Sequence, residues 1–298
     1  MSQMAQAARP EPERATGSAR SEAGRIGTRA GSDPRFLDAL HAEWTKLRTL
    51  PGTSWLLLAA AALTIAVSAA AAAAFHCPPA GCAPGQTGAD PAKLGLTGVD
   101  LGQVVIALLA VGAIGGEYGT GMIRLTLTAV PRRLTAFAAK ALVTTAAAVA
   151  ASLLAVGGSA VAGWLILPAQ GLSAANGYVP LSLAHAADLR ALGGSVLYLT
   201  LIALLAFGVT TAVRDSAMGI GLVLGLLFLF PLVSAVIPDH ALARHLEQSA
   251  PMTAGLGIQA TVGVGSLPLT PWQGLGVTAA WAAGALILGA AVLRLRDA

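Results

Sequence analysis

The stretch GGEYGTGMIRLTLTAVPRRLTAFAAK, from Gly115 to Lys140, is the one polar passage between two long apolar runs. The run before it, LGQVVIALLAVGAI, covers 101–114, and the run after it covers 141–167 without a charged residue. Lysine and arginine next to a membrane span resist translocation, so a basic loop between two spans stays on the cytoplasmic side. The stretch therefore predicts two transmembrane helices joined by a cytoplasmic loop that a soluble partner can bind.

The composition of the whole chain is that of an integral membrane protein. Of its 298 residues, 55% are hydrophobic and 11% are charged, and the mean hydropathy is +0.72. A soluble domain has about a quarter charged residues. The net charge of +4 would fit nucleic-acid binding, but the charges gather at the ends of the apolar segments and in the N-terminal tail, as membrane topology requires. We therefore expect no nucleic acid among the partners.

Six apolar segments predict transmembrane helices, because about twenty apolar residues at 1.5 Å each cross the ~30 Å hydrocarbon layer. They cover about 55–75, 101–116 (or from Leu94 onward), 136–167, 194–213, 217–237 and 272–293. The third is long enough to project beyond the membrane. Residues 1–32 have no periodic apolar pattern and predict a disordered cytoplasmic tail, so residues 33–298 form one six-span, all-α membrane domain.

The segment from Asp33 to Leu50 predicts an amphipathic helix in the membrane interface. Asp33 suits the N-cap and Pro34 the first helical position. Residues recurring at three- and four-residue steps form the apolar face: Phe36, Leu37, Leu40, Trp44 and Leu47. Other faces hold most of the polar residues, namely Arg35, Asp38, Glu43 and Lys46. Trp44 would then lie at headgroup depth, in contact with membrane lipids. The alternative is a helix that binds a soluble partner.

The distribution of basic residues predicts the orientation. With both termini inside, the outer side holds only Lys93, Arg190 and Arg244, whereas the other lysines and arginines fall inside. This bias survives when the distal tail is left out of the comparison. We therefore expect a multi-pass protein of the plasma membrane with both termini in the cytoplasm.

The connections outside the membrane leave several alternatives open. Cys77 and Cys82 lie in the loop HCPPAGC, where they form a disulfide or remain two free thiols. A metal site with His76 would need a further ligand from elsewhere. Asp100 either caps the second span or faces a substrate path.

Two longer connections are also expected outside. A short amphipathic piece is expected at 181–192, before the fourth span. The outer loop 238–271 is the largest, and it can dip into the membrane where protein shields it.

The sequence shows no catalytic or metal-binding signature. The central parts of the spans lack ionisable residues, which argues strongly against proton coupling and less strongly against sodium coupling. The motifs HExxH, GxSxG and GxxxxGK[ST] are absent. We expect a chain that is not an enzyme, has no catalytic residues, metal or cofactor of its own, and takes energy from another subunit if it moves a substrate.

Three stretches of the chain resemble a known family. AEWTKLRT (42–49) before a Trp-led first span looks like the start of ABC type-two exporter permeases. GEYGTGMIRLTLTAVPRRLTAFAAK (116–140) is similar to that family's actinobacterial GE-Y-x-TG-x-IR…T…P-x-R…AK signature, and the ending LTPWQGLG…LRLRDA also fits. The resemblance spans 33–298. The N-terminal tail lies outside it, and the cysteine loop is not part of the expected pattern.

The resemblance implies a six-span permease that forms a homodimer or heterodimer and pairs with two ATP-binding cassette ATPase subunits, which bind ATP and Mg²⁺. It implies an interfacial helix at 33–50, with Trp44, Lys46 and Arg48, and a cytoplasmic coupling helix near 121–130 that docks on the ATPase. Sequence physics alone is less decisive, because 123–128 also alternates like a strand. The resemblance assigns the following residues to coupling: Glu117, Tyr118, Gly121, Arg124, Pro131, Arg132 and Arg133.

Several of these residues have a plainer interpretation. Glu117 is expected to pair with a nearby arginine, Arg124 or Arg132, either to couple motion or as an ordinary interfacial salt bridge. The basic residues Arg132, Arg133 and Lys140 also serve as topology anchors. Gly121 either permits a tight turn or reflects the high glycine content of the chain.

The function expected from the sequence is export of a hydrophobic or amphiphilic compound, such as a drug, lipid or secondary metabolite. The alternative is a membrane anchor or assembly protein that binds a non-ATPase partner in the cytoplasm.

Overall fold

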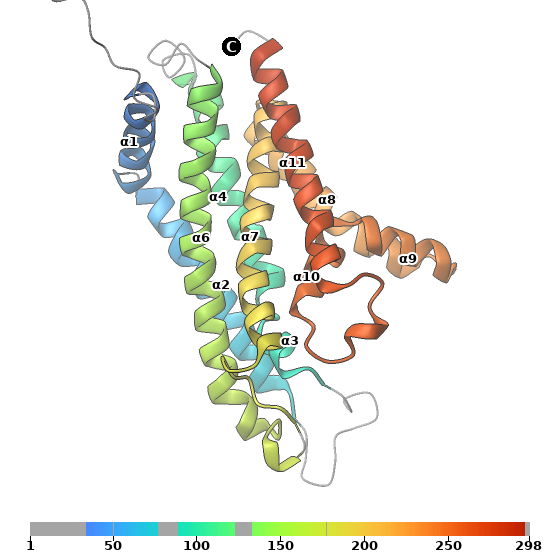
Figure 1. Ribbon diagram of the computed structural model, residues 1–298. Coiled ribbons are helices and arrows are strands. Elements are labelled where there is room, and N and C mark those ends of the chain that lie inside the picture. Colours follow the sequence, from blue (N-terminus) through green and yellow to red (C-terminus); the bar gives the residue numbers. More distant parts are fainter. Residues whose placement is uncertain (1–33, 50, 77–88, 123–132, 177, 296–298) are drawn as a thin grey trace, which may run out of the picture. The chain divides into compact units, whose positions relative to one another are not determined.

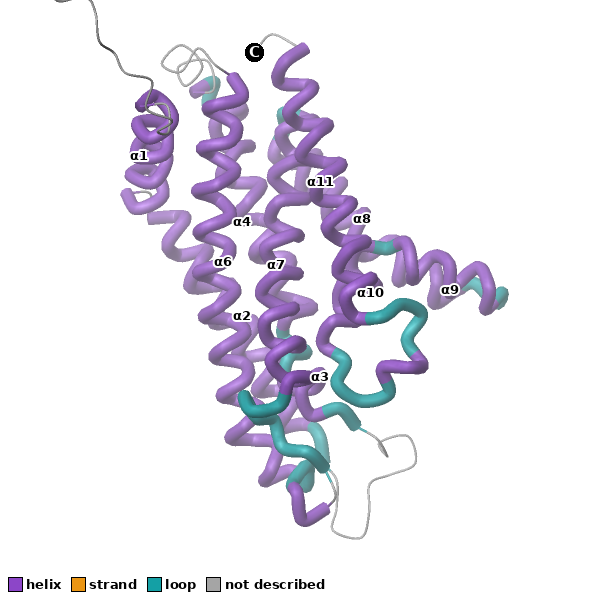
Figure 2. Tube along the Cα trace, viewed as in Figure 1, coloured by secondary structure: helices purple, strands orange, loops and turns teal. Residues whose placement is uncertain are grey.

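The computed structural model describes residues 34–49, 51–76, 89–122, 133–176 and 178–295 of the chain. Within these ranges every regular element is a helix, and no strand occurs (Figure 2). Six helices of this part of the chain are long and apolar enough to cross a membrane, judged by length and composition. The predicted all-helical, multi-span fold is therefore confirmed at this level.

The spanning helices follow the apolar segments of the sequence. They are α2 (Pro51–Ala74), α4 (Val99–Gly119), α6 (Arg133–Ile166), α7 (Ala186–Val213), α8 (Ser216–Val236) and α11 (Pro271–Leu295). The shorter elements are α1 (Pro34–Thr49), α3 (Pro91–Gly95), α9 (His240–Ser249), α10 (Pro251–Leu256) and the 3-10 turns η1 (Leu167–Gln170), η2 (Ala174–Asn176), η3 (Gly257–Gln259) and η4 (Val264–Ser266). The 34 residues of α6 make it about 51 Å long, so it exceeds the ~30 Å hydrocarbon layer as predicted.

The helix α7 lies at the centre of the bundle, where it packs against α4, α6, α8 and α11 (Figure 1). Its largest fully buried side chains are Tyr198, Leu199, Ile202, Leu205 and Phe207. The ring of Phe207 contacts that of Phe137 on α6, with centroids 5.3 Å apart. The Tyr198 hydroxyl donates a hydrogen bond to Oε1 of Gln103 on α4, so this buried polar group is satisfied.

Two connections differ from the sequence expectations. The piece 181–192 is not a separate amphipathic segment, because α7 begins at Ala186 and includes its second half. Asp100 lies in the first turn of α4, but Gly98 occupies the N-cap position and no side chain caps that helix. The predicted capping role of Asp100 is therefore wrong.

The large loop 238–271 contains helices of its own. Asp239 caps α9, because its carboxylate accepts the backbone N–H groups of Ala241 at 2.8 Å and Leu242 at 3.3 Å. After α9 the chain turns back, and α10 and η3 pack against the bundle helices α7 and α11. Residues of α10 and η3 are buried by this packing, whereas α9 has no buried residue, and entry of the loop into the membrane stays a prediction.

Side-chain contacts identify which termini of the helices share an end of the bundle. Arg133 at the start of α6 donates to the Leu293 carbonyl of α11 at 3.2 Å. Arg214, between α7 and α8, donates to the Val292 carbonyl at 3.1 Å. At the opposite end, Asp90 before α3 contacts Thr261 of the loop after η3. The first of these ends carries the candidate site.

Candidate functional site

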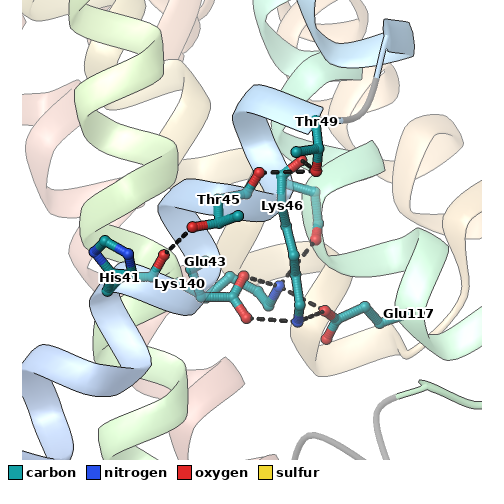
Figure 3. Close-up of polar contacts among 8 residues, drawn as sticks. His41, Glu43, Thr45, Lys46, Thr49, Glu117 and Lys140 are labelled. Atoms are coloured by element: carbon teal, nitrogen blue, oxygen red, sulfur yellow. Dashed lines mark hydrogen bonds and ion pairs between the residues drawn. The ribbon is translucent and has the colours of Figure 1, made fainter.

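Four charged side chains form a continuous network where α1, α4 and α6 meet. They are Glu43 and Lys46 on α1, Glu117 on α4 and Lys140 on α6, and we call them the four-charge network (Figure 3). Nζ of Lys140 lies 2.5 Å from Oε2 of Glu43 and 2.8 Å from Oε1 of Glu117. Nζ of Lys46 lies 2.8 Å from Oε1 of Glu43 and 3.0 Å from Oε1 of Glu117. Each lysine therefore bridges both carboxylates.

The network is largely removed from solvent. The side chains of Lys140, Glu117 and Glu43 are 8%, 9% and 10% exposed, whereas that of Lys46 is 35% exposed. The two positive and two negative charges balance, which is the condition under which buried charges persist. Because removal of one partner from a buried pair costs about 3–5 kcal/mol, the network fixes α1 to α4 and α6.

The pKa values of the two α1 residues follow from this arrangement. Burial alone would raise the pKa of Glu43, but attraction and hydrogen bonds from Lys140 and Lys46 outweigh it and hold that pKa below its ordinary value. Burial alone would lower the pKa of Lys46, but hydrogen bonds and attraction from Glu43 and Glu117 outweigh it and raise that pKa. Both groups are therefore held in the charged form at neutral pH.

Local sequence explains how each charge reaches the network. Glu43 and Lys46 are three residues apart on α1, so they lie on adjacent turns of one face. Thr45 and Thr49 direct their hydroxyls to the carbonyls of His41 and Thr45, each at 2.8 Å, and so take no part in the network (Figure 3). Glu117 and Lys140 lie near the end of α4 and the start of α6. The network therefore lies between the two helix ends that flank residues 120–132.

Arginines join the same end of the bundle to α11. The Arg133 and Arg214 contacts reach the carbonyls of Leu293 and Val292, in the last turn of α11. Carbonyl groups in the last turn of a helix lack partners within the helix, and a cation there also opposes the negative end of the helix dipole. α6 and the α7–α8 turn are thereby tied to α11.

The remaining predicted site residues that the structure describes lie outside the four-charge network. Tyr118 is half-buried, and its hydroxyl is buried without a hydrogen-bond partner among the described residues. Gly121 has φ +71°, a conformation that favours glycine, so the turn is the better explanation of this residue. Trp44 and Arg48 are exposed on α1. The predictions for Cys77, Cys82, Arg124, Pro131, Arg132 and residues 1–32 lie outside the described residues.

Sequence reasoning missed two members of the network. The sequence pattern predicts Glu43 on a polar face of α1, yet it is buried and pairs with Lys140 of α6, whereas the apolar Leu37 and Trp44 are about half exposed. The sequence predicts Lys140 as a topology anchor, yet it is the most buried charge of the four. Glu117 pairs with lysines rather than with a described arginine, and the expected partners Arg124 and Arg132 lie outside the described residues. The only local signal of the network in the sequence is Glu43, an acidic residue three positions before Lys46.

Among the described residues, no group of three or more His, Cys, Asp or Glu side chains is arranged to hold a metal ion. No protein-family model matches the chain, and no curated protein matches it.

Proposed function

We propose that this chain is the permease subunit of an ATP-binding cassette exporter in the plasma membrane, with both termini in the cytoplasm. In this proposal it pairs with a second permease, identical or related, and with two separate ATPase subunits that bind ATP and Mg²⁺. The chain itself is a transport subunit and not an enzyme. The six apolar helices and the resemblance of residues 116–140 to the family signature support this proposal.

The four-charge network is the observation that carries the proposal. It contains residues of α4 and α6, the two helices that flank residues 120–132 in the sequence, and it joins these helices to each other and to α1. The family resemblance assigns the segment near 121–130 to contact with the ATPase. Packed helices joined in this way move as a rigid group when one of them is displaced. A displacement of residues 120–132 would therefore move α4, α6 and α1 together.

The proposed cycle uses this rigid group. The ATPase subunits close on ATP and displace the coupling segment near 121–130, with Arg124, Pro131 and Arg132 in the contact region. The displacement passes through Glu117 and Lys140 to the spanning helices and opens a path for the cargo. α1 lies at the membrane surface, where the exposed Leu37, Trp44 and Arg48 contact lipid. The charge-free central parts of the spans favour an apolar or amphiphilic cargo.

Co-purification tests the partner. The tagged full chain is extracted from its native membranes in mild detergent, and proteins that accompany it are identified and assayed for ATP binding and hydrolysis. We expect an ATPase with a GxxxxGK[ST] phosphate loop. A stoichiometric partner without nucleotide binding would instead identify a membrane anchor, and substrate turnover by the isolated chain would identify an enzyme.

Substitution of Glu117 tests the coupling role. In the assembled complex, Glu117→Gln and Arg124→Gln should each lower transport by about fivefold or more, while ATP hydrolysis and membrane insertion persist. Asp38→Asn, which removes an exposed carboxylate on α1 outside the network, is the matched control and should transport normally. Normal transport by both the Glu117 and Arg124 variants would remove these residues from the mechanism.

A further inference from the structure

A pocket of about 550 Å³ lies at the end of the bundle opposite the four-charge network. Its walls come from the start of α3, the segment at 178–179, the first turn of α7 and the loop after η3. The volume is within the range of small-molecule sites, about 300–1,000 Å³. Pro91, Ala92, Val179 and Val262 give the pocket apolar walls, and Tyr178 adds an aromatic ring.

Asp90 holds two of these walls together. Its carboxylate caps α3 by accepting the N–H groups of Ala92 and Lys93, each at 3.1 Å. The same carboxylate accepts the Thr261 hydroxyl at 2.6 Å and the Val262 N–H at 2.9 Å. Because its two oxygens receive these several donors, Asp90 acts as a structural clamp and has little capacity left for a ligand.

Asp188 is the charged group of the pocket that remains available. It is only 6% exposed, in the first turn of α7, and its Oδ2 accepts the Ser182 N–H at 2.9 Å. Among the described residues, no hydrogen bond reaches its Oδ1. A mostly buried carboxylate with an oxygen unused favours a cation nearby.

Among the described residues around the pocket, no permanently charged side chain forms an ion pair with Asp188. The charged and titratable groups on the surrounding elements are His185 at the N-cap of α7, Asp188 and Arg190 of α7, Asp90 and Lys93 at α3, and Tyr178. Among the described residues that line the pocket there is no lysine or arginine, and Nη2 of Arg190 is directed to the Ala260 carbonyl at 2.5 Å. Nδ1 of His185 lies 3.5 Å from Oδ2 of Asp188 and carries a charge only when protonated.

We propose that this pocket binds a lipophilic organic cation, with its charge at Asp188 and its apolar body against Tyr178 and the apolar walls. A carboxylate attracts either a metal ion or an organic cation. The apolar walls favour the organic one, and so does the lack of a cluster of metal-ligating side chains among the described residues. An aromatic ring such as that of Tyr178 also attracts cations through its face. This assignment names a cargo class for the proposed exporter, and in that sense it rests on the proposed function.

Equilibrium dialysis of the purified full chain in lipid nanodiscs, without any ATPase, tests the site. The probe is tetraphenylphosphonium, and the matched anion of nearly the same shape is tetraphenylborate; empty nanodiscs give the background. We expect saturable binding of the cation alone. Asp188→Asn should weaken it about tenfold or more, whereas Asp239→Asn, which changes a helix-capping aspartate outside the pocket, should not.

Ala187→Phe provides a second variant that leaves every charge in place and fills the pocket. It should also abolish saturable binding, with an unchanged elution profile in gel filtration. Equal binding of tetraphenylborate, or undiminished binding by both Asp188→Asn and Ala187→Phe, would overturn the proposal. The dialysis assay contains no ATPase, so its result does not depend on the exporter function. Saturable cation binding in this assay, together with the absence of an ATPase from the co-purification, would refute the exporter function and support the cation site.

Discussion

At the scale of single residues, the four-charge network shows that the contribution of a charged side chain to stability depends on its burial and on its partners. Lys140 and Lys93 are both lysines near the start of a helix, but Lys140 is 6% exposed and meets two carboxylates, whereas Lys93 is exposed. An exposed ion pair contributes about 0–1 kcal/mol. A buried charge that loses its partner is far more costly.

We therefore predict that Lys140→Met destabilises the chain by about 3–5 kcal/mol, because Glu43 and Glu117 then share a buried site with only Lys46 to offset them. Thermal unfolding in detergent, followed by tryptophan fluorescence, measures the effect. Lys93→Met is the matched control and should shift the midpoint little. Equal midpoints for the two variants would show that the network does not stabilise the fold.

The lowered pKa of Glu43 predicts how this stability varies with pH. A carboxyl group with a lower pKa in the folded state stabilises the fold above its unfolded pKa, about 4.3, and this contribution is lost as the pH falls through the folded value. The difference in unfolding midpoint between the natural chain and Glu43→Gln should thus be constant near neutral pH and shrink in acid below about pH 4. A difference independent of pH would contradict the assignment.

At the scale of elements, α7 and α11 pack tightly against each other beside the core. A Cβ atom built on Gly208 of α7 would lie 2.5 Å from the carbonyl carbon of Ala285 and 2.6 Å from the nitrogen of Leu286 on α11. Small residues permit such close approach of helix backbones, which increases packing contacts between membrane helices. The absence of a side chain at Gly208 is therefore a packing requirement.

Gly208→Val should consequently force α7 and α11 apart and lower stability by about 1–3 kcal/mol. Gly221→Val on α8 is the matched control, since a Cβ there meets no atom within 4 Å. Unfolding midpoints in detergent, together with the protease resistance of each variant, measure the difference. If Gly208→Val were as stable as the control, the close contact between α7 and α11 would be wrong.

At the scale of the whole molecule, the two ends of the bundle differ in kind. One end carries the four-charge network and the arginine contacts to α11, and the other carries the Asp90 clamp and the pocket at Asp188. In the proposed orientation, which follows from the bias of basic residues, the first end faces the cytoplasm. The proposed coupling and cation sites would then lie on opposite sides of the membrane.

Cysteine labelling of intact cells checks this orientation. In a background without Cys77 and Cys82, a membrane-impermeant maleimide should label Ala184→Cys, which lies at the pocket end, from outside. Thr120→Cys, after α4, should be labelled only once the cells are opened. Labelling of Thr120→Cys in intact cells would reverse the orientation and refute the coupling role of the network.

The sequence by itself determined the number, type and approximate limits of the spanning helices. Hydropathy over some twenty residues is a local property, and the apolar segments at 217–237 and 272–293 match α8 and α11 to within two residues at each end. The expectations for Gly121 and Pro34 likewise depend on local properties, namely the backbone conformation of Gly121 and the position of Pro34 at the start of α1. Such features need no knowledge of what lies next to the helix.

Only the tertiary structure decided which charges meet. Glu43 and Lys140 are 97 residues apart, and nothing in the local pattern of either helix indicates that they pair. The same holds for Asp90 and Thr261, 171 residues apart, which close the pocket at Asp188. Burial and Coulomb attraction act through space, so these sites exist only after the helices have packed.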